Sequence, residues 1–299
     1  ENRMNEIPDM TSNEIWGNHL ILTEKVRGLC RAAIQKALKA ANTPRAKQHV
    51  ETMAAIQEST DAFCDAIEHA RETGDFGAAA KMIEPVFAIA DKLNSLYPYF
   101  MNPQRVNKET KTQYLTGGWY NKYLTFDKTI KGSATWVVLP RYMKIINDTA
   151  NTAWAKGYHK PETDVSALPD GDSTLIPDIT FGTEREPASF FYRTDLEVPA
   201  SFANRKKITL YFPSIIARAV QIWINGQAVE FTHGNYRNTT WYGPDYFWVD
   251  YNHQQMFDVT PHIKPGAKNT IAFRIFKSYD HGGSYDRIFL LAEPPSENK

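Results

Sequence analysis

The stretch from Ala219 to Phe231, "AVQIWINGQAVEF", decides the fold of the C-terminal half of this chain. Its side chains alternate in character, and a period of two residues is typical of a β-strand. The alternation assigns Val220, Ile222 and Ile224 to one face of a sheet, and Gln221 and Trp223 to the other. Asn225 and Gly226 then tolerate the positive φ that a two-residue turn needs. The stretch therefore predicts a β-hairpin.

Further short runs with strand character flank this hairpin. They read "ATWVVLP", "SFFYRTDLEV", "KKITLYFP", "AVEF", "NTIAFRIF" and "RIFLLAE", with turn sequences such as "KPGAKN" between them. No helical pattern separates these runs, which argues against a parallel sheet with crossover helices. The C-terminal half is therefore expected to be an antiparallel β-sandwich of the jelly-roll type.

The N-terminal half has a helical period instead. Apolar residues recur at intervals of three and four from Ser12 to about Arg71, and "NTPRAK" interrupts them. Thr43 is suited to cap a helix and Pro44 to occupy its first turn. Gly74 is expected to end that second helix, after which Asp75 caps a third. This half is therefore predicted to be an antiparallel helical bundle that acts as a spacer or docking domain.

Three details complete the expected organisation. Pro85 should kink or restart the third helix, because proline lacks the amide hydrogen that the helix needs. A short fourth helix is expected between Pro103 and Gln113. The composition changes from Ala, Glu and Lys to Gly, Pro, Thr and aromatic residues near Leu115. The predicted domains are therefore residues 1–114 and 115–295, giving a two-domain α + β protein.

The overall charge excludes some classes of partner. The chain has 34 Lys and Arg residues against 34 Asp and Glu residues, so its net charge is zero. It offers no basic footprint for nucleic acid, and no uninterrupted apolar window long enough for membrane insertion. The chain begins "ENRMNEIPDM", which resembles no signal peptide. We expect a piece of a longer secreted, periplasmic or cell-surface protein whose signal peptide lies outside this fragment.

The two cysteines lie on consecutive predicted helices. In an antiparallel hairpin, Cys64 would be about 10 Å out of register with Cys30. A disulfide needs Cα atoms about 4.4 to 6.8 Å apart, so two buried thiols are the default and a bridge is the less favoured alternative.

Several motifs of the C-terminal half occur in a familiar order. They are "FFYRTDLEVPAS", the "WING" hairpin, "FDVT" followed by "KPGAKN", and "GGSYDR" ending at Arg287. Together they resemble the galactose-binding-like jelly roll that is the sugar-binding domain of family 2 glycoside hydrolases. With a degenerate opening segment, "NTAWAKGYHKPETDVSAL", the resemblance extends over about residues 134–293. It does not include the helical half.

The resemblance implies a non-catalytic role. In the resembling enzymes the catalytic carboxylates lie on a separate barrel, for which this chain has no room. No nucleophile elbow, phosphate loop or zinc-deaminase pattern occurs either. Asp280 and Asp286 are the only carboxylate pair that we would test for a small standalone hydrolase. We therefore expect that this fragment is not an enzyme and that its catalytic partner domain lies elsewhere in the parent chain.

The sequence departs from the resembling domains in one loop. About twenty residues separate His233 from Phe257, where the family keeps a short connection, and they include "YRNTTWYGPDYFWVDY". Exposed rings beside polar groups suit carbohydrate, although the insert could also pack internally or against another domain. The last loop, "SYDHGGSYDR", is expected at the same end as the hairpin loops. The predicted glycan contacts are Trp241, Tyr242, Tyr236, Arg237, Tyr246, Trp248, Tyr279, Asp280, His281 and Tyr285.

No cofactor is predicted, and metal sites are disfavoured. His233, His253 and His281 fit no zinc template. A structural calcium ion at Asp164, Asp170 and Asp172 is conceivable, although their spacing is unlike that of an EF-hand.

Two functions remain open from the sequence. The first is a carbohydrate-binding module region of a larger secreted polysaccharide-degrading enzyme, with a polysaccharide or oligosaccharide as ligand. The alternative is a pair of accessory domains that brace the missing catalytic barrel without binding glycan themselves.

Overall fold

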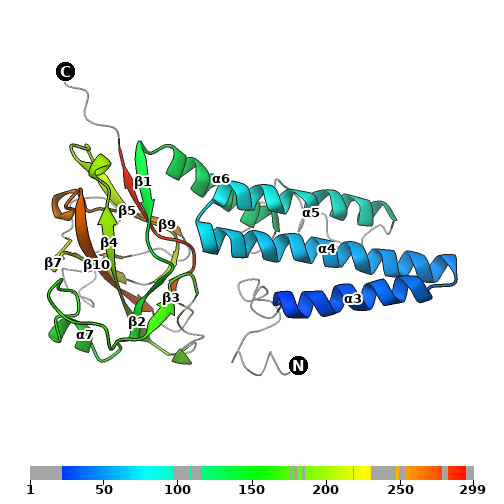
Figure 1. Cartoon of the computed structure of the whole chain (residues 1–299), viewed down its shortest axis with the longest axis horizontal. Coiled ribbons are helices and arrows are strands. Elements are labelled where there is room, and N and C mark those ends of the chain that lie inside the picture. Colours follow the sequence, from blue (N-terminus) through cyan, green and yellow to red (C-terminus); the bar gives the residue numbers. More distant parts are fainter. Residues whose placement is uncertain are drawn as a thin grey trace, which may run out of the picture. The chain divides into compact units, whose positions relative to one another are not determined.

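The computed structural model shows a mixed α + β chain that separates into two compact units, Glu1–Thr129 and Ile130–Lys299 (Figure 1). The first unit contains long helices, and the second contains two antiparallel sheets. None of the described helices is both long and apolar enough to cross a membrane. The structure describes residues 22–96, 108, 116–175, 177, 181–183, 186–217, 219–229, 247–248, 253–277 and 282–293.

Helices α3 (Glu24–Ala40) and α4 (Pro44–Thr73) are joined by the turn that the sequence predicts. The Thr43 hydroxyl accepts a hydrogen bond of 3.1 Å from the amide of Ala46, and Pro44 occupies the first turn of α4. Gly74 ends α4 with φ of 75°, a left-handed conformation that glycine adopts without a steric penalty. The expected N-cap, proline and C-terminal glycine are confirmed.

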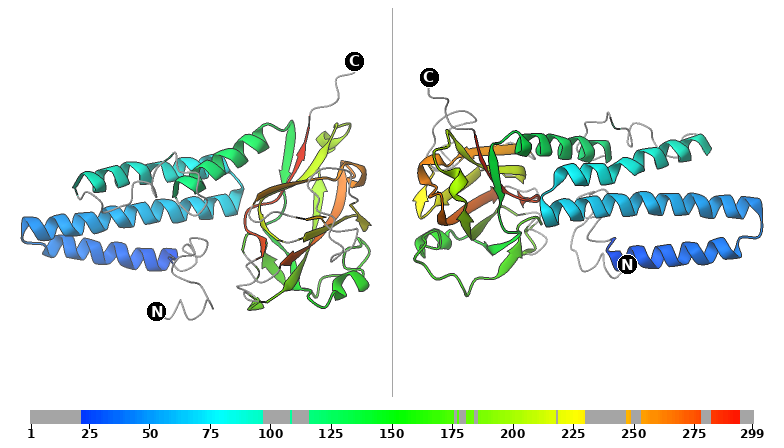
Figure 2. Two further views of the ribbon diagram at one scale, coloured as in Figure 1. Left: turned by 180° about the vertical axis from the view of Figure 1, so that it is seen from behind. Right: turned by 45° about the horizontal axis from the view of Figure 1, so that its top comes forward.

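Helix α5 (Phe76–Leu96) follows directly, and both views in Figure 2 show it running beside α4. The Asp75 carboxylate accepts a hydrogen bond of 2.9 Å from the amide of Ala78, as expected of a cap. The helix does not restart at Pro85, which lies inside it. One missing amide hydrogen is tolerated here because α5 buries an apolar face along its length. The helix predicted over Pro103–Gln113 lies outside the described residues, except for Lys108.

Helix α6 (Thr116–Lys131) moves the boundary between the two units to a later position than the one expected near Leu115. Its Trp119 ring packs edge to face on Phe63 of α4, and its Tyr123 ring lies 5.4 Å from that of Phe76 in α5. These rings are buried, so α6 packs on α4 and α5, and residues 116–129 belong to the first unit. The two glycines in "YLTGGWY" concealed this helix, because glycine is a poor helix former.

Both cysteines are free thiols, as the default expected, but only Cys64 is buried, and the expectation of burial is wrong for Cys30, which is partly exposed. Cys64 is buried in α4, and burial raises the pKa of its thiol to about 11. A thiol with that pKa is protonated at neutral pH and is a poor nucleophile, so Cys64 acts as a small apolar core residue.

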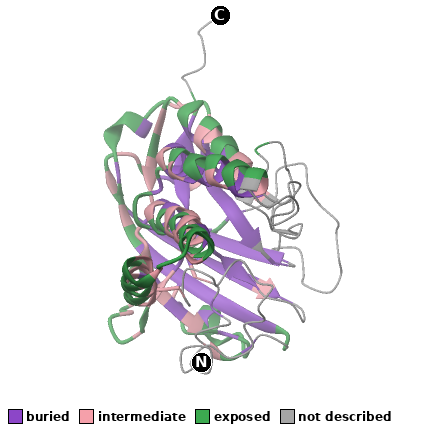
Figure 3. Ribbon diagram, turned by 90° about the vertical axis from the view of Figure 1, so that its right-hand side faces the viewer, coloured by how far each residue is buried: buried purple, intermediate pink, exposed green. Residues whose placement is uncertain are grey.

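The second unit is built around two antiparallel sheets within the described residues, whose strands are mostly buried (Figure 3). One sheet contains β3 (Asp170–Asp172), β2 (Tyr142–Asn147), β4 (Ala188–Val198), β10 (Ala267–Lys277), β6 (Ala219–Ile224), β7 (Gln227–Ala228) and β8 (Phe247–Trp248). The other contains β1 (Thr135–Val138), β12 (Phe289–Ala292), β5 (Ile208–Ile216), β11 (Gly283–Ser284) and β9 (His253–Asp258). Short helical turns occur at Thr152–Ala155 (α7), Ala200–Phe202 and Thr260–His262.

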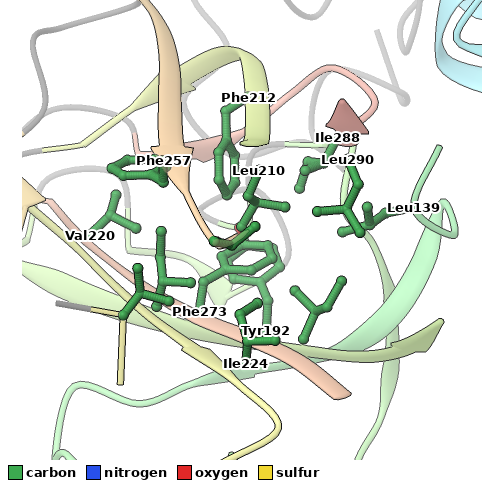
Figure 4. Close-up of a cluster of buried hydrophobic side chains, with 14 of the residues drawn as sticks. Leu139, Tyr192, Leu210, Phe212, Val220, Ile224, Phe257, Phe273, Ile288 and Leu290 are labelled. Carbon is green, nitrogen blue, oxygen red and sulfur yellow. The ribbon is translucent and has the colours of Figure 1, made fainter. Parts of the chain in front are cut away.

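Side chains from both sheets meet in one hydrophobic core (Figure 4). The ring of Phe212 in β5 lies 5.1 Å from that of Phe273 in β10, edge to face, and 5.8 Å from that of Phe257 in β9. Tyr192 in β4 stacks on Phe273 at 4.6 Å. The aromatic side chains thus link strands of the two sheets, as the alternating pattern requires.

The two faces predicted for β6 are confirmed. Val220, Ile222 and Ile224 belong to this central core, whereas Trp223 is buried in a smaller cluster with Phe191 and Ala272. Asn225 and Gly226 have φ of 54° and 83°, as a tight hairpin turn requires. Gln227 and Ala228 of the expected second strand form β7, and the amide of Val229 donates a hydrogen bond of 2.9 Å to the carbonyl of Ile222. Glu230 and Phe231 lie outside the described residues.

Strand β2 was not predicted, although "YMKIIN" alternates between exposed and buried residues. It pairs with β4 through partners such as Ile145 and Tyr192, about fifty residues apart in the sequence. The six residues of β2 include Lys144 and Asn147, and so short a run cannot be recognised as a strand by its alternation alone.

Candidate functional site

Most of the predicted glycan contacts lie outside the described residues. This group comprises Tyr236, Arg237, Trp241, Tyr242, Tyr246, Tyr279, Asp280 and His281. Trp248 lies in β8, and Tyr285 follows β11. The strands beside these residues are described, and their pairing shows where the loops begin and end.

The aromatic insert begins after β7, beside Ile222, but its last part and both flanks of the last loop lie at the same end of the β unit, where His253 pairs with Ile215. Trp248, inside the insert, pairs with Ala219 at the beginning of β6. Ala219 also pairs with Phe276, next to the residue that ends β10 and precedes the last loop. Gly283, where that loop ends, pairs with Ile216 immediately before the β5–β6 connection. Strand register therefore brings the last part of the insert and both flanks of the last loop together.

The turn at Asn225–Gly226 lies at the opposite end. Ile224 pairs with Ile271, near the start of β10, whereas the last loop follows Lys277 at the end of that strand. The expectation that the last loop shares an end with this hairpin turn is thus wrong. An antiparallel strand of eleven residues separates the two ends, and the loop is grouped with β8 instead.

Tyr285 is placed differently from the other candidates. Its side chain is only 6 % exposed, so the ring has no open face of the kind that stacking on a pyranose requires. The preceding Gly283 has φ of 140°, and a Cβ atom there would lie 2.3 Å from Cδ of Pro177. This part of the "GGSYDR" motif therefore supports the backbone and the packing.

The carboxylate pair considered for hydrolysis does not form an open site at Asp286. Asp286 is buried, and the adjacent Arg287 donates a hydrogen bond of 2.6 Å to the carbonyl of Leu139. A glycosidase carboxyl group must reach the glycosidic bond, which a buried side chain does not do. Asp280 lies outside the described residues.

The three carboxylates considered for calcium are directed to different partners. Asp172 makes an ion pair of 2.8 Å with Arg141, and Asp170 makes one of 3.0 Å with Lys144. Asp164 accepts a hydrogen bond of 2.8 Å from the amide of Ser166. Over the part of the chain that was described, no group of three His, Cys, Asp or Glu residues could hold a metal ion.

The segment 148–165 includes most of the opening segment noted in the sequence, and it covers the outer cluster around Trp223, which the sequence did not indicate. The guanidinium of Arg274 in β10 holds the start of this segment. It donates a hydrogen bond of 2.7 Å to the carbonyl of Asp148 and another to the side chain of Asn151. Its Nε atom lies 3.3 Å from the Asp148 carboxylate. The other carboxylate oxygen of Asp148 accepts the amides of Thr152 and Ala153, at 2.7 and 2.9 Å. Helix α7 is therefore fixed to the sheet.

A second buried arginine holds the later part of the same segment. Arg193 in β4 donates hydrogen bonds to the carbonyls of Tyr158 and Thr163, at 2.8 and 2.9 Å. The two arginines are 126 and 35 residues from their main backbone acceptors, Asp148 and Tyr158. Contacts over such separations cannot be inferred from local sequence patterns.

Three rings of this region form a row of successive neighbours, from Trp154 through His159 to Trp223. The Trp154 and His159 rings are parallel within 6° at 6.4 Å, and His159 lies 5.3 Å from Trp223. His159 is buried. Burial lowers the pKa of its imidazole, and the positive charges of Lys160 and Arg193 lower it further against the opposing effect of Glu162. The structure thus favours the neutral ring.

The first prediction concerns the pH dependence of this row. Because the folded-state pKa of His159 is below that of an unfolded histidine, about 6.5, the unfolded chain binds the proton first. Its contribution to stability is complete above about pH 6.5 and is lost as the pH falls, by at most about 1.4 kcal/mol per pH unit. Thermal unfolding of the His159→Phe variant should therefore show a weaker pH dependence than the wild type between about pH 5 and 8.

His262→Phe is the matched control, because this histidine lies in the same unit and its Nδ1 contacts the Gln227 side chain at 3.3 Å in an exposed position. The control should keep the wild-type pH dependence. An unchanged profile in His159→Phe would show that the buried imidazole does not couple to folding.

Comparison with known proteins gives limited information. No family model and no curated protein matches this chain. Among solved structures, it is similar to the b-glucuronidase from Ruminococcus gnavus in complex with D-glucaro-d-lactam, at 15 % identity and a TM-score of 0.40. A second structure, Ruminococcus gnavus Beta-glucuronidase, has 15 % identity and a TM-score of 0.41.

These alignments cover 54 % and 55 % of this chain and 29 % of each of those chains. The chain therefore spans less than a third of the proteins that it resembles. A likeness of this degree does not establish a shared fold or activity.

Proposed function

We propose that the β unit is a non-catalytic carbohydrate-binding module with a galactose-binding-like jelly roll, and that it belongs to a larger secreted polysaccharide-degrading enzyme. The observation that carries this proposal is the strand register, which brings the last part of the aromatic insert and the flanks of the last loop to the same end of the unit. The ligand is a polysaccharide or oligosaccharide, and the helical unit is a bundle that spaces or docks the module.

The chemistry of the two loops supports this ligand class. Indole and phenol rings cover the apolar faces of pyranoses, and amide, carboxylate and guanidinium groups bind their hydroxyls. The insert contributes Trp241 and Tyr242 beside a Gly-Pro turn, and the last loop contributes Asp280 and His281. The affinity of each site should be modest, because exposed polar contacts compete with water.

Affinity electrophoresis of the full chain in gels that contain different polysaccharides tests the proposal. Retardation by at least one polysaccharide is expected, with Trp241→Ala or Tyr242→Ala weakening it. Loss of a central aromatic contact should cost about 1–2 kcal/mol, or about 5- to 30-fold in affinity.

Trp136→Ala is the matched control. Trp136 is 46 % exposed on β1 of the other sheet, and its loss should leave retardation unchanged. If the folded wild-type chain migrates normally in every polysaccharide tested, the binding proposal fails.

The second candidate is a pair of accessory domains that brace a catalytic domain. Two exposed apolar side chains on the five-stranded sheet, Trp136 of β1 and Met256 of β9, favour it. If the two domains brace a catalytic domain, the parent enzyme should lose stability when residues 1–299 are removed, while its retention by glycan is unaffected.

A further inference from the structure

We propose that Trp154 forms a second glycan-binding platform, on the outer face of the seven-stranded sheet and separate from the loops at the end of the unit. The ligand is a pyranose residue of a glycan chain, which stacks on the indole. The inference rests on the proposed function for its ligand class, but it involves none of the residues assigned to the loop site.

The first argument is exposure. Trp154 is 56 % exposed, although the rings beneath it, His159 and Trp223, are buried. An exposed tryptophan by itself is ordinary on a protein surface. Here the exposed ring is the outermost member of a row of three that continues into the sheet.

The second argument is the anchoring of the backbone on both sides of Trp154. Helix α7, which carries Trp154, is tied to β10 through Arg274 and Asp148. Arg193 ties the following turn to β4. A tryptophan held between two anchored points loses little conformational entropy when a ligand binds, and preorganised aromatic side chains are effective binding groups for this reason.

The third argument is the choice of histidine beneath the indole. His159 Nδ1 is buried without a hydrogen-bond partner in the structure, and burial of an unpaired polar atom is destabilising. An aliphatic side chain would fill the space without this cost. A flat imidazole, however, lies parallel to the Trp154 ring and next to the Trp223 ring, so it is the ring that links the exposed indole to the sheet.

The fourth argument is the polar surroundings. Lys156 lies between Trp154 and His159 in the sequence, Lys160 and Glu162 follow His159, and all three are exposed. The charges of Lys160 and Glu162 are close enough to act on the His159 imidazole. Ammonium groups donate to sugar hydroxyls and carboxylates, and the Glu162 carboxylate accepts from hydroxyls. A ring with donors and an acceptor around it matches the mixed apolar and polar surface of a pyranose.

The test uses the full chain labelled with 5-fluorotryptophan. The protein has seven tryptophans, and Trp→Phe variants assign the fluorine resonances of Trp154 and Trp241. Oligosaccharides are prepared from a polysaccharide that retards the chain, or from the whole panel if none does. Saturable shifts are expected at both resonances.

Two variants separate the sites. In the Trp241→Ala, Tyr242→Ala double variant the Trp154 shift should persist with an unchanged midpoint. In Trp154→Ala the Trp241 shift should persist, which also shows that the β unit remains folded. His159→Ala should raise the midpoint of the Trp154 shift at least threefold while leaving that of Trp241 unchanged.

The outcomes distinguish this inference from the proposed function. A saturable Trp241 shift without any Trp154 shift overturns the second platform and leaves the loop site intact. A Trp154 shift that disappears in the loop double variant also overturns it, because the two sites would then be one. Absence of any shift overturns both proposals.

Discussion

Replacement of Arg274 by Met is expected to lower the free energy of unfolding of the β unit by about 3–5 kcal/mol. The Asp148 side chain that faces this guanidinium is fully buried, and Nε of Arg274 lies 3.3 Å from its carboxylate. Methionine would fill part of the space but would leave a buried carboxylate without its cation. It would also remove the hydrogen bonds to Ser189 and to the Asp148 carbonyl.

Hydrogen exchange of peptides from β4 and β10 during urea titration of the full chain measures this loss without interference from the helical unit. Lys268→Met is the matched control on the same strand. Lys268 is 63 % exposed and pairs with Asp195 at 3.0 Å, so its loss should cost no more than about 1 kcal/mol. Equal effects of the two substitutions would contradict the role of Arg274 as a buried anchor.

Truncation of Phe212 to Ala should have a similarly large effect, about 3–5 kcal/mol. The ring is buried between Phe257 and Phe273, which belong to different sheets. Its removal leaves a cavity where strands of the two sheets meet, and close-packed neighbours relax only partly into such a space.

Met256→Ala is the control for Phe212→Ala, because Met256 lies on β9 and is 51 % exposed. The same urea titration should show a change below about 1 kcal/mol for this variant. If Phe212→Ala destabilised β5 and β9 but not β4 and β10, the two sheets would not share one cooperative core.

Local chemistry explains why much of the fold was predictable. Val220, Ile222 and Ile224 alternate with Gln221 and Trp223 in the two-residue period of a strand, and the two sets are buried on opposite faces of β6. Helix α4 begins after Thr43, because a hydroxyl caps free amides, and ends at Gly74, because glycine accepts a positive φ. Each of these signals is contained within a few residues of the sequence.

The parts that could not be predicted depend on distant contacts. Helix α6 contains two adjacent glycines and is stabilised by packing of rings such as Trp119 on other helices. Strand β2 is defined by its pairing with β4. The ion pair of Arg274 with Asp148 joins residues from separate parts of the β unit. Such elements are fixed by tertiary structure rather than by local propensity.

The candidate site likewise has features that the sequence predicted and features that depend on distant contacts. The sequence identified an aromatic insert and a polar last loop, but only the pairing of Ala219 with Trp248 and with Phe276 groups the last part of the insert and the last loop at one end. Tyr285 was predicted to contact glycan because it lies in the last loop, but its side chain is buried. Trp154 was quoted within the opening segment, but its exposure and its stack on His159 depend on packing that alternation and spacing do not encode.

Isothermal titration of the full chain with an oligosaccharide from a retarding polysaccharide tests the central claim most directly. Our account predicts saturable heat with a dissociation constant between about 10 µM and 1 mM, and no release of reducing sugar during prolonged incubation. Trp241→Ala should weaken this binding by about 5- to 30-fold. Absence of binding heat with the chain folded, or turnover of the oligosaccharide that disappears in Asp280→Asn, would contradict the assignment of a non-catalytic carbohydrate-binding module.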